Sequence, residues 1–287
     1  MFPTNIGGAL KHLRDGFSKA GVETPELDAR LLLEWATGAD RLTVFTSPDR
    51  SLDASETAKL LDAMGRRLAH EPVHRIMGRR GFYGLGFELS RETLEPRPDT
   101  ECLVEMVLKH LKGREDEALT LLDLGSGTGI IVISLLTHLL KARAVATDIS
   151  PGALAMCGRN AEANGVHSRL TRFQSNWFES VEGRFDVIVS NPPYIPTDDI
   201  ASVSREVRDF DPALALDGGA DGLDAYRALA EGAAAHLLEG GILALEIGYD
   251  QRALVGRIFA DAGFALAEAA RDLGGNDRAL LFTRADA

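Results

Sequence analysis

Residues 121–129 have the sequence Leu-Leu-Asp-Leu-Gly-Ser-Gly-Thr-Gly, and this stretch decides the fold of the chain. A short apolar strand is predicted to lead into a glycine-rich turn, which an apolar helix over residues 130–140 follows. Glycines let a ligand approach the backbone, whose N–H groups and helix start favour an anionic group. The turn lacks the spacing of the dinucleotide fingerprint and the Lys-Ser/Thr of a P-loop, which disfavours hydride and phosphoryl transfer. A purely structural tight turn remains an alternative.

The alternation of strand and helix continues from this stretch toward the C-terminus. Apolar runs predict strands at residues 119–124, 143–147, 169–173, 185–190 and 241–247, with helical segments between them. Such an alternation predicts βαβ units and a parallel sheet covered by helices, with ligand sites at the carboxyl ends of the strands. Residues 264–270 and 278–283 flank a Gly-Gly-Asn-Asp turn and predict a final hairpin, which adds an antiparallel edge strand.

The N-terminal part has a different pattern. Apolar residues at helical spacing predict helices between residues 6 and 68, with Thr24 as an N-cap and Gly21 and Gly38 as stops, so we expect a small helical domain over residues 1–80. Residues 81–98 are expected to form a hairpin and linker, and residues 99–287 the α/β domain. Asp99 or Thr100 is expected to cap a helix that runs to about residue 111.

Composition narrows the class of protein. The formal net charge of -12 and the pI near 5.1 disfavour a dedicated duplex-DNA binder, whose affinity comes largely from Lys and Arg. Cys102 and Cys157 are the only cysteines, so neither a disulfide framework nor a metal site is expected. No secretory signal or membrane span is recognised, so we expect a soluble, cytoplasmic protein without metal or membrane partners.

Two further residues lie where the predicted strands end. Asp148 follows the glycines by about twenty residues, the position at which a carboxylate accepts hydrogen bonds from both hydroxyls of a ribose. It could instead assist a helix cap at Ser150-Pro151. Trp177 follows the next predicted strand, where an adenine ring could stack, although an isolated tryptophan is more often a core or lid residue.

Residues 185–190 end abruptly in Asn191-Pro192-Pro193-Tyr194. Because proline cannot continue a central strand, this tetrapeptide is predicted to form a rigid turn at the carboxyl end of a buried strand. The prolines supply carbonyl acceptors without donors of their own, and an aromatic ring stands beside them. A planar NH2 group, with two protons to place and a flat face to cover, fits such an edge.

The motifs occur in the order expected of a methyltransferase that uses S-adenosylmethionine. Together with residues 95–101, 215–223, 245–248 and 275–278, they make the chain resemble the release factor glutamine N5-methyltransferases of the HemK/PrmC type over nearly its whole length. The resemblance implies a seven-stranded, Rossmann-like α/β class I methyltransferase sheet behind a helical domain that binds release factors. Two positions depart from the family pattern: Glu95 replaces an aliphatic residue, and Asn176 replaces an aspartate.

The resemblance implies transfer of a methyl group to the glutamine of the Gly-Gly-Gln motif in class I peptide release factors, with no nucleic-acid substrate. It also implies the roles of the site residues. The cofactor would contact Gly125, Ser126, Gly127, Thr128, Gly129, Asp148, Trp177 and Asn191. The glutamine would contact Asn191, Pro192, Pro193 and Tyr194, of which Asn191, Pro192 and Tyr194 would take part in catalysis.

Other functions remain open at this point. The same tetrapeptide could present its acceptors to the amino group of adenine N6 or guanine N2, which would make the protein a nucleic-acid methyltransferase. Acidity, and the lack of a recognition domain for a flipped base, disfavour that alternative. A catalytically silent binding module and a nicotinamide oxidoreductase are two further alternatives, and the oxidoreductase fits the motifs least.

Overall fold

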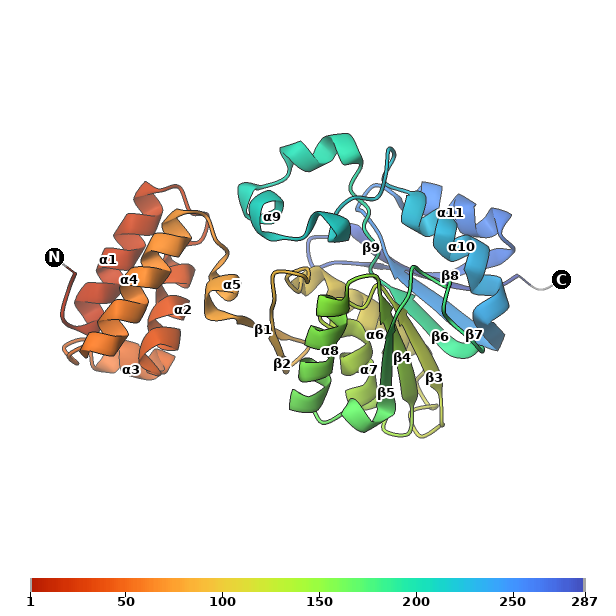
Figure 1. Cartoon of the computed structure of the whole chain (residues 1–287), viewed down its shortest axis with the longest axis horizontal. Coiled ribbons are helices and arrows are strands. Elements are labelled where there is room, and N and C mark those ends of the chain that lie inside the picture. The colour runs from red at the N-terminus through yellow and green to blue at the C-terminus, as the bar shows by residue number, and fades with distance from the viewer. Residues whose placement is uncertain (1, 286–287) are drawn as a thin grey trace. The chain divides into compact units, whose positions relative to one another are not determined.

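The computed structural model describes residues 2–285, which form two compact units (Figure 1). The smaller unit contains residues 2–79 and the short segment 205–210, and the larger unit contains the rest. Residues 81–98, which the sequence sets apart as a hairpin and linker, belong to the larger unit. Phe82 and Phe87 explain this assignment, because both side chains are buried in the core of that unit.

The smaller unit is helical, as predicted. Its elements are α1 (Ile6–Lys19), α2 (Pro25–Thr37), α3 (Arg41–Thr46), α4 (Ala54–Leu68), α5 (Val73–Met77) and α9 (Arg205–Phe210). Apolar side chains at helical spacing, such as Leu13, Phe17 and Leu60, are fully buried between the helices. Thr24 is the N-cap residue of α2 as expected, but its hydroxyl donates to the Asp28 carboxylate, 3.0 Å away, and its side chain caps no backbone N–H.

A buried ion pair ties the smaller unit together. Arg67 and Asp28 are each 3% exposed, and Nε of Arg67 lies 2.7 Å from Oδ2 of Asp28. Nη2 of Arg67 also donates to Oε1 of Glu206 at 2.6 Å. A guanidinium with several fixed donors can therefore satisfy two carboxylates at once, which accounts for the inclusion of α9 in this unit.

The larger unit contains a seven-stranded sheet of order β5-β4-β3-β6-β7-β9-β8. Its strands are β3 (Thr120–Leu124), β4 (Arg143–Asp148), β5 (Leu170–Gln174), β6 (Phe185–Ser190), β7 (Leu237–Glu246), β8 (Phe264–Arg271) and β9 (Asp277–Arg284). Strands β3 to β7 pair in parallel, whereas β9 runs antiparallel to β7 and β8. The predicted fold class, including the terminal hairpin, is confirmed.

One strand begins earlier than predicted. β7 already pairs with β6 at Leu237, and the pairing then shifts register before Ile242. Gly240 has φ +72° inside this irregularity, a backbone conformation that glycine adopts without strain. The two glycines at 240 and 241 resemble a turn in the sequence but lie within a strand in the structure, because a bulge needs the same backbone freedom as a turn.

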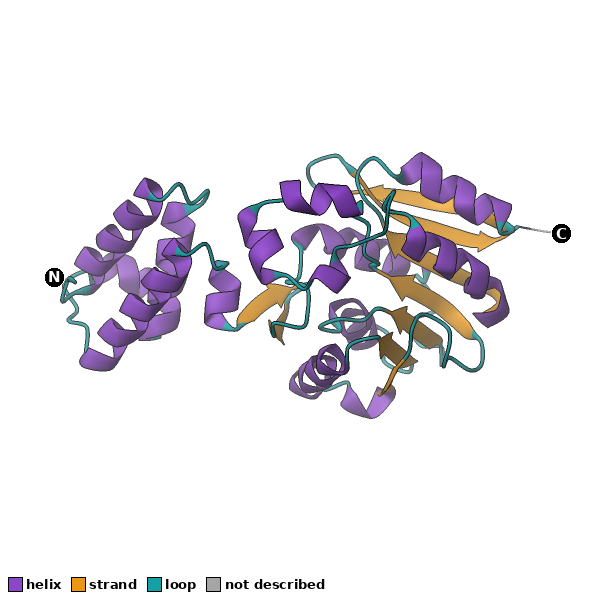
Figure 2. Ribbon diagram, turned by 45° about the horizontal axis from the view of Figure 1, so that its top comes forward, coloured by secondary structure: helices purple, strands orange, loops and turns teal. Residues whose placement is uncertain are grey.

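Helices cover both faces of the sheet (Figure 2). Alternate residues of a strand point to opposite faces, so Leu121 and Val187 lie in one core and Leu122 and Ile188 in the other. Buried residues of α6 (Glu101–His110), α7 (Ile130–His138) and α8 (Pro151–Ala163) complete the first core, and those of α10 (Asp224–His236) and α11 (Arg252–Asp261) the second. The carboxyl ends of the parallel strands are left for a site.

Short elements join these layers. The predicted hairpin is present as β1 (Arg79–Phe82) and β2 (Leu85–Glu88), with Tyr83 and Gly84 in the turn at φ +49° and +74°. The 3₁₀ helices are η1 (Pro98–Thr100), η2 (His167–Arg169), η3 (Thr197–Ser202) and η4 (Ala213–Ala215). Thr100 stands at the N-cap position of α6, one of the two residues expected there, but its backbone is already helical and its side chain caps no backbone N–H. Among the described residues, no helix is long and apolar enough to cross a membrane.

Candidate active site

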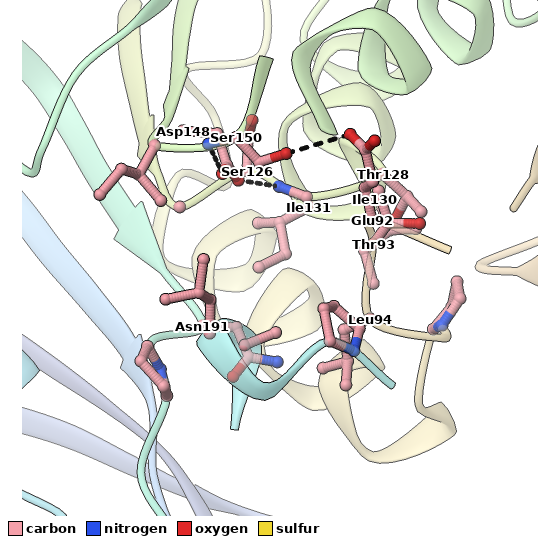
Figure 3. A pocket seen from close by; sticks show the side chains of 18 of the residues that line it. Glu92, Thr93, Leu94, Ser126, Thr128, Ile130, Ile131, Asp148, Ser150 and Asn191 are labelled. Atoms are coloured by element: carbon pink, nitrogen blue, oxygen red, sulfur yellow. Dashed lines mark hydrogen bonds between the residues drawn. The ribbon is translucent and has the colours of Figure 1, made fainter. Parts of the chain in front are cut away.

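A pocket of about 370 Å³ opens at the carboxyl edge of the sheet (Figure 3). Four neighbouring strands supply lining residues directly after their last residues or at their ends, as the topology of a parallel sheet requires. The lining includes residues 91–97, 125–128, 148–150 and 175–177 and also Thr100, Asn191 and Pro193. The volume lies in the range of small-molecule sites.

The glycine-rich turn forms the floor of the pocket. Gly125, Gly127 and Gly129 have φ values of +71°, +54° and +82°, which residues with a side chain rarely adopt. A Cβ on Gly129 would lie 2.7 Å from Sγ of Cys157, so the close packing of helix α8 also requires glycine there. Residues 125–128 line the pocket, whereas Gly129, which was expected to contact the cofactor, does not line it and packs against Cys157 and Ile133 instead.

Asp148 connects this turn to the next helix. Its Oδ2 accepts a hydrogen bond from the backbone N–H of Gly127, and its Oδ1 accepts one from that of Ser150, both at 2.9 Å. Ser150 in turn caps α8 by accepting from the N–H of Ala153 at 3.2 Å. Burial raises the pKa of Asp148, and the backbone donors oppose that shift. The carboxylate therefore lines the pocket and also supports the cap, so the two sequence interpretations are compatible.

Residues 91–97 form one wall of the pocket, which the sequence did not predict. Oε2 of Glu92 accepts from the hydroxyl of Ser150 at 3.3 Å and lies where a side chain on Gly152 would begin. Nη2 of Arg97 contacts Oδ2 of Asp211 at 2.5 Å. Glu95, a departure from the family pattern, is 3% exposed and forms an ion pair with Arg80. The unusual carboxylate is thus compensated within the same unit.

Trp177 lines the pocket and also packs against the core of the larger unit. Its φ is +48°, and its Cζ3 would lie 3.8 Å from a Cβ on Gly125. The Ser175 hydroxyl donates to the Trp177 carbonyl at 2.8 Å, which holds the unusual backbone conformation in place. Asn176 also lines the pocket, while its amide donates to Glu179 at 2.7 Å.

The tetrapeptide Asn191-Pro192-Pro193-Tyr194 follows β6 as predicted. Asn191 and Pro193 line the pocket, and Pro192 is buried. Tyr194 packs against the core on the side of α10, and burial raises the pKa of its hydroxyl to about 12. Nδ2 of Asn191 donates to Oγ1 of Thr100 at 3.4 Å. The structure therefore places Asn191 at the junction of pocket, strand end and helix α6.

A second loop supports the tetrapeptide from behind. The backbone N–H of Ile195 donates to the carbonyl of Leu216 at 3.0 Å. The backbone N–H of Gly218 donates to the carbonyl of Ile195 at 2.9 Å. A Cβ on Gly222 would lie 2.5 Å from the carbonyl oxygen of Tyr194, so only glycine permits this approach. The Ala-Leu-Asp-Gly-Gly-Ala-Asp-Gly-Leu motif at 215–223 is explained by this packing.

Gln251 joins that loop to the tetrapeptide and to the end of β7. Its Nε2 donates to the carbonyls of Tyr194 at 2.9 Å and of Gly222 at 3.2 Å. Its Oε1 accepts from the N–H of Gly248 at 3.0 Å and from the hydroxyl of Tyr226 at 3.4 Å. A side chain that is 6% exposed thus has all its polar positions in use, which makes it a rigid support.

Asp123 is a buried carboxyl beneath the glycine-rich turn that the sequence analysis did not select as a site residue. It is 1% exposed, and neither carboxyl oxygen has a partner of regular hydrogen-bond geometry among residues 2–285. Burial raises its pKa to about 7, and the backbone N–H of Val132 opposes the shift only in part. A cationic ligand above the turn would compensate this carboxylate.

The raised pKa of Asp123 predicts how the stability of the protein depends on pH. The folded-state pKa of Asp123 lies above its ordinary value, so its contribution to stability is present at low pH and decreases as pH rises toward 7. The stability advantage of Asp123→Asn over the wild type should therefore grow by about 1.4 kcal/mol per pH unit between pH 5 and 7. Urea unfolding of both proteins without ligands checks this. A pH-independent difference would contradict it.

The fold and its glycine-floored pocket define a Rossmann-like class I methyltransferase with a helical N-terminal domain. Two family models match the chain, "PrmC N-terminal domain" over residues 8–78 and "Methyltransferase small domain" over residues 99–207. A solved structure of ribosomal protein L11 methylase from Lactobacillus delbrueckii subsp. bulgaricus is similar in fold, with a TM-score of 0.51 at 21% identity, and covers 70% of this chain and 94% of that chain.

Curated relatives give the family. A release factor glutamine methyltransferase of Agrobacterium fabrum is 48% identical to this chain, and the match covers 97% of each. A release factor glutamine methyltransferase of Cereibacter sphaeroides is 45% identical, and the match covers 94% of this chain and 95% of that protein. The chain belongs to the release factor glutamine methyltransferase family, which confirms the resemblance that the motifs indicate.

Proposed function

We propose that the protein transfers a methyl group from S-adenosylmethionine to the side-chain amide nitrogen of the glutamine in the Gly-Gly-Gln motif of class I peptide release factors. The observation that carries this proposal is the position of Asn191, which lines the glycine-floored pocket at the carboxyl end of β6. Membership of the family supports the choice of substrate. Since release factors act on cytoplasmic ribosomes, we infer that the protein works in the cytoplasm.

The residues of the pocket fit the cofactor. Asp148 would accept hydrogen bonds from the ribose hydroxyls, Trp177 would present an aromatic face to the adenine, and residues 125–128 would offer their glycine-rich backbone; all of them line the pocket. The buried carboxyl of Asp123 beneath them suits a ligand that carries positive charge. When bound, S-adenosylmethionine supplies an electrophilic methyl group on a sulfonium. No group of three or more metal-ligating side chains occurs among the described residues.

The chain's task is to orient a poor nucleophile. The lone pair of an amide nitrogen is delocalised into its carbonyl, so the nitrogen must be held in one direction. We assign the two N–H bonds of the glutamine to the Asn191 side-chain oxygen and the Pro192 carbonyl, with Pro193 shaping the turn and Tyr194 beside the amide plane. Near-attack geometry can supply about 7 to 11 kcal/mol, whereas one neutral hydrogen bond contributes only about 1 kcal/mol.

The ribose contact can be tested separately. Asp148→Asn removes a charged acceptor and replaces one of its oxygens by a donor, so either the Gly127 or the Ser150 contact is also lost. We expect the Kd for S-adenosylmethionine to rise roughly 10- to 100-fold, as for the loss of a charged hydrogen bond. At saturating cofactor, kcat should stay within about threefold of the wild type, since Asp148 does not touch the reacting nitrogen. Calorimetry measures the affinity, and an unchanged Kd would exclude this role for Asp148.

Mass spectrometry tests the reaction itself. The full-length protein is incubated with cofactor and a class I release factor, and peptides are sequenced for a single added methyl on the glutamine of the Gly-Gly-Gln motif. A release factor with alanine in place of that glutamine is the matched control and should gain no methyl. Methylation of stripped RNA or DNA instead would favour a nucleic-acid methyltransferase. Cofactor binding without transfer to any release factor would indicate a binding module.

A further inference from the structure

Glu246 lies beside Asn191, although the proposed mechanism does not use it. The parallel register pairs Ser190 of β6 with Leu245 of β7, so the next residues along both strands, Asn191 and Glu246, are neighbours. Glu246 is 1% exposed, and its Oε2 has no hydrogen-bond partner within the part of the chain that the structure describes. A buried carboxyl next to the proposed catalytic amide calls for a physical explanation.

Thr100 connects the two side chains. It is fully buried, and its Oγ1 accepts from Nδ2 of Asn191 at 3.4 Å. Hydrogen bonding by the Thr100 hydroxyl, and also directly by the Asn191 amide, favours the charged form of Glu246 and opposes the rise of its pKa on burial. Since Thr100 caps no backbone N–H, its hydroxyl is free for this arrangement. Glu246, Thr100 and Asn191 therefore form one hydrogen-bond chain.

The chemistry of the three groups fixes the direction of the chain. A carboxylate only accepts hydrogen bonds, so the single hydroxyl proton of Thr100 points to Glu246. The Thr100 oxygen then presents a lone pair to Asn191, and only the Nδ2 end of that amide can donate to it. The Oδ1 end is left free, and it is the end that must accept an N–H of the substrate.

We propose that Glu246 and Thr100 are positioning residues, which fix the Asn191 side-chain amide with its oxygen toward the substrate nitrogen. This inference rests on the proposed function for its kinetic consequences. The orientation of the amide is a property of the protein alone and can be observed without any substrate.

Protonation of Glu246 should reverse the chain. Burial raises the pKa of Glu246 to about 7, while Thr100, Arg278 and Asn191 favour its charged form and Asp99 opposes it. A protonated Glu246 donates to Thr100, whose proton then turns to Asn191 and selects the opposite amide orientation. We therefore expect kcat at saturating cofactor to rise with pH through about 7.

Glu246 is the carboxyl of this cluster whose pKa lies near 7. Nη2 of Arg278, on β9, lies 3.1 Å from Oδ2 of Asp272 and 3.8 Å from Oδ2 of Asp99. Burial raises the pKa of Tyr194 and of Cys102 to about 12, and that of Tyr226 well above its ordinary value. These three groups stay neutral between pH 6 and 8.

Three variants test the chain by kinetics on the full-length protein with a class I release factor. Thr100→Val removes the hydroxyl at nearly constant volume and should lower kcat roughly 10- to 100-fold, with the Kd for cofactor within about threefold. Thr100→Ser restores the hydroxyl and should recover kcat to within about threefold of the wild type. Glu246→Gln can donate to Thr100 at every pH, so its kcat should be low and flat between pH 6 and 8.

A readout without substrate separates this inference from the proposed function. The side-chain NH2 resonances of Asn191, assigned by their loss in Asn191→Ala, should shift with a midpoint near pH 7 in the wild type and not in Glu246→Gln. If that shift is seen but no release factor is methylated, the proposed function fails and the hydrogen-bond chain stands. The inference is overturned if the Asn191 resonances do not shift with pH. It is also overturned if Thr100→Val keeps the full kcat, or if the kcat of Thr100→Ser is as low as that of Thr100→Val.

Discussion

Replacing Asn191 by alanine is expected to reduce kcat roughly 100-fold or more while the Kd for S-adenosylmethionine stays within about threefold. The side chain lines the pocket at the end of β6, and its proposed task is to aim the substrate nitrogen at the methyl group. Loss of aim affects the transition state far more than the bound cofactor, because the cofactor keeps its contacts to residues 125–128, Asp148 and Trp177. Single-turnover methyl transfer and calorimetry measure the two quantities.

A matched control is available for this variant. Asn164 is another asparagine whose side-chain amide donates a hydrogen bond, in its case to the backbone carbonyl of Gly86 at 3.0 Å, but it does not line the pocket. Asn164→Ala should therefore leave kcat within about twofold of the wild type. Near-normal turnover in Asn191→Ala, with intact cofactor binding, would remove Asn191 from the mechanism and leave the tetrapeptide with a purely structural role.

The second large effect is expected from Gln251→Glu, a change of nearly equal shape. Two donors become acceptors, so the carbonyls of Tyr194 and Gly222 lose their partners and a carboxyl is buried without a counter-charge. We expect the free energy of unfolding at pH 8 to fall by roughly 3 to 5 kcal/mol. Denaturant unfolding monitored by circular dichroism measures the loss.

The pH dependence identifies the cause of this loss. Burial raises the pKa of the new carboxyl, so its protonated form is favoured in the folded state, and the penalty should shrink as pH falls from 8 to 5. Gln174→Glu is the control, because Gln174 is exposed and donates a single hydrogen bond to the carbonyl of Ile149 at 2.8 Å. Its effect should stay within about 0.5 kcal/mol. An equal loss at both positions would show that Gln251 gives no special support.

The two residues with the largest expected effects, Asn191 and Gln251, differ in how clearly the sequence alone points to them. Asn191 belongs to a short tetrapeptide that interrupts an apolar strand, and such an interruption is conspicuous. Gln251 stands before a helix in an ordinary context, and nothing local distinguishes it from an exposed glutamine. Its four hydrogen bonds reach residues 194, 222, 226 and 248, which only folding brings together.

Other differences have the same origin. Thr100 has the residue type and position of a helix cap, yet its hydroxyl contacts Asn191, 91 positions along the chain. Glu246 and Asp123 did carry a signal, because each is the single acid in its predicted apolar strand, 241–247 and 119–124, and acids are rarely buried unless they have a function or a partner. Helices α3 and α5 escaped prediction because six and five residues are too few for a periodic pattern.

Local sequence is enough to predict the order of strands and helices, the glycine-rich turn and the Asn-Pro-Pro-Tyr edge, since backbone freedom, proline geometry and apolar periodicity act between near neighbours. Those local rules are sufficient to predict the sheet and the edge at which its pocket lies. The tertiary structure alone decided that the Glu92 segment walls the pocket, that Gln251 supports Tyr194, and that Glu246 and Thr100 reach Asn191. A polar side chain has many alternative partners along a chain, and only packing of distant segments selects one of them.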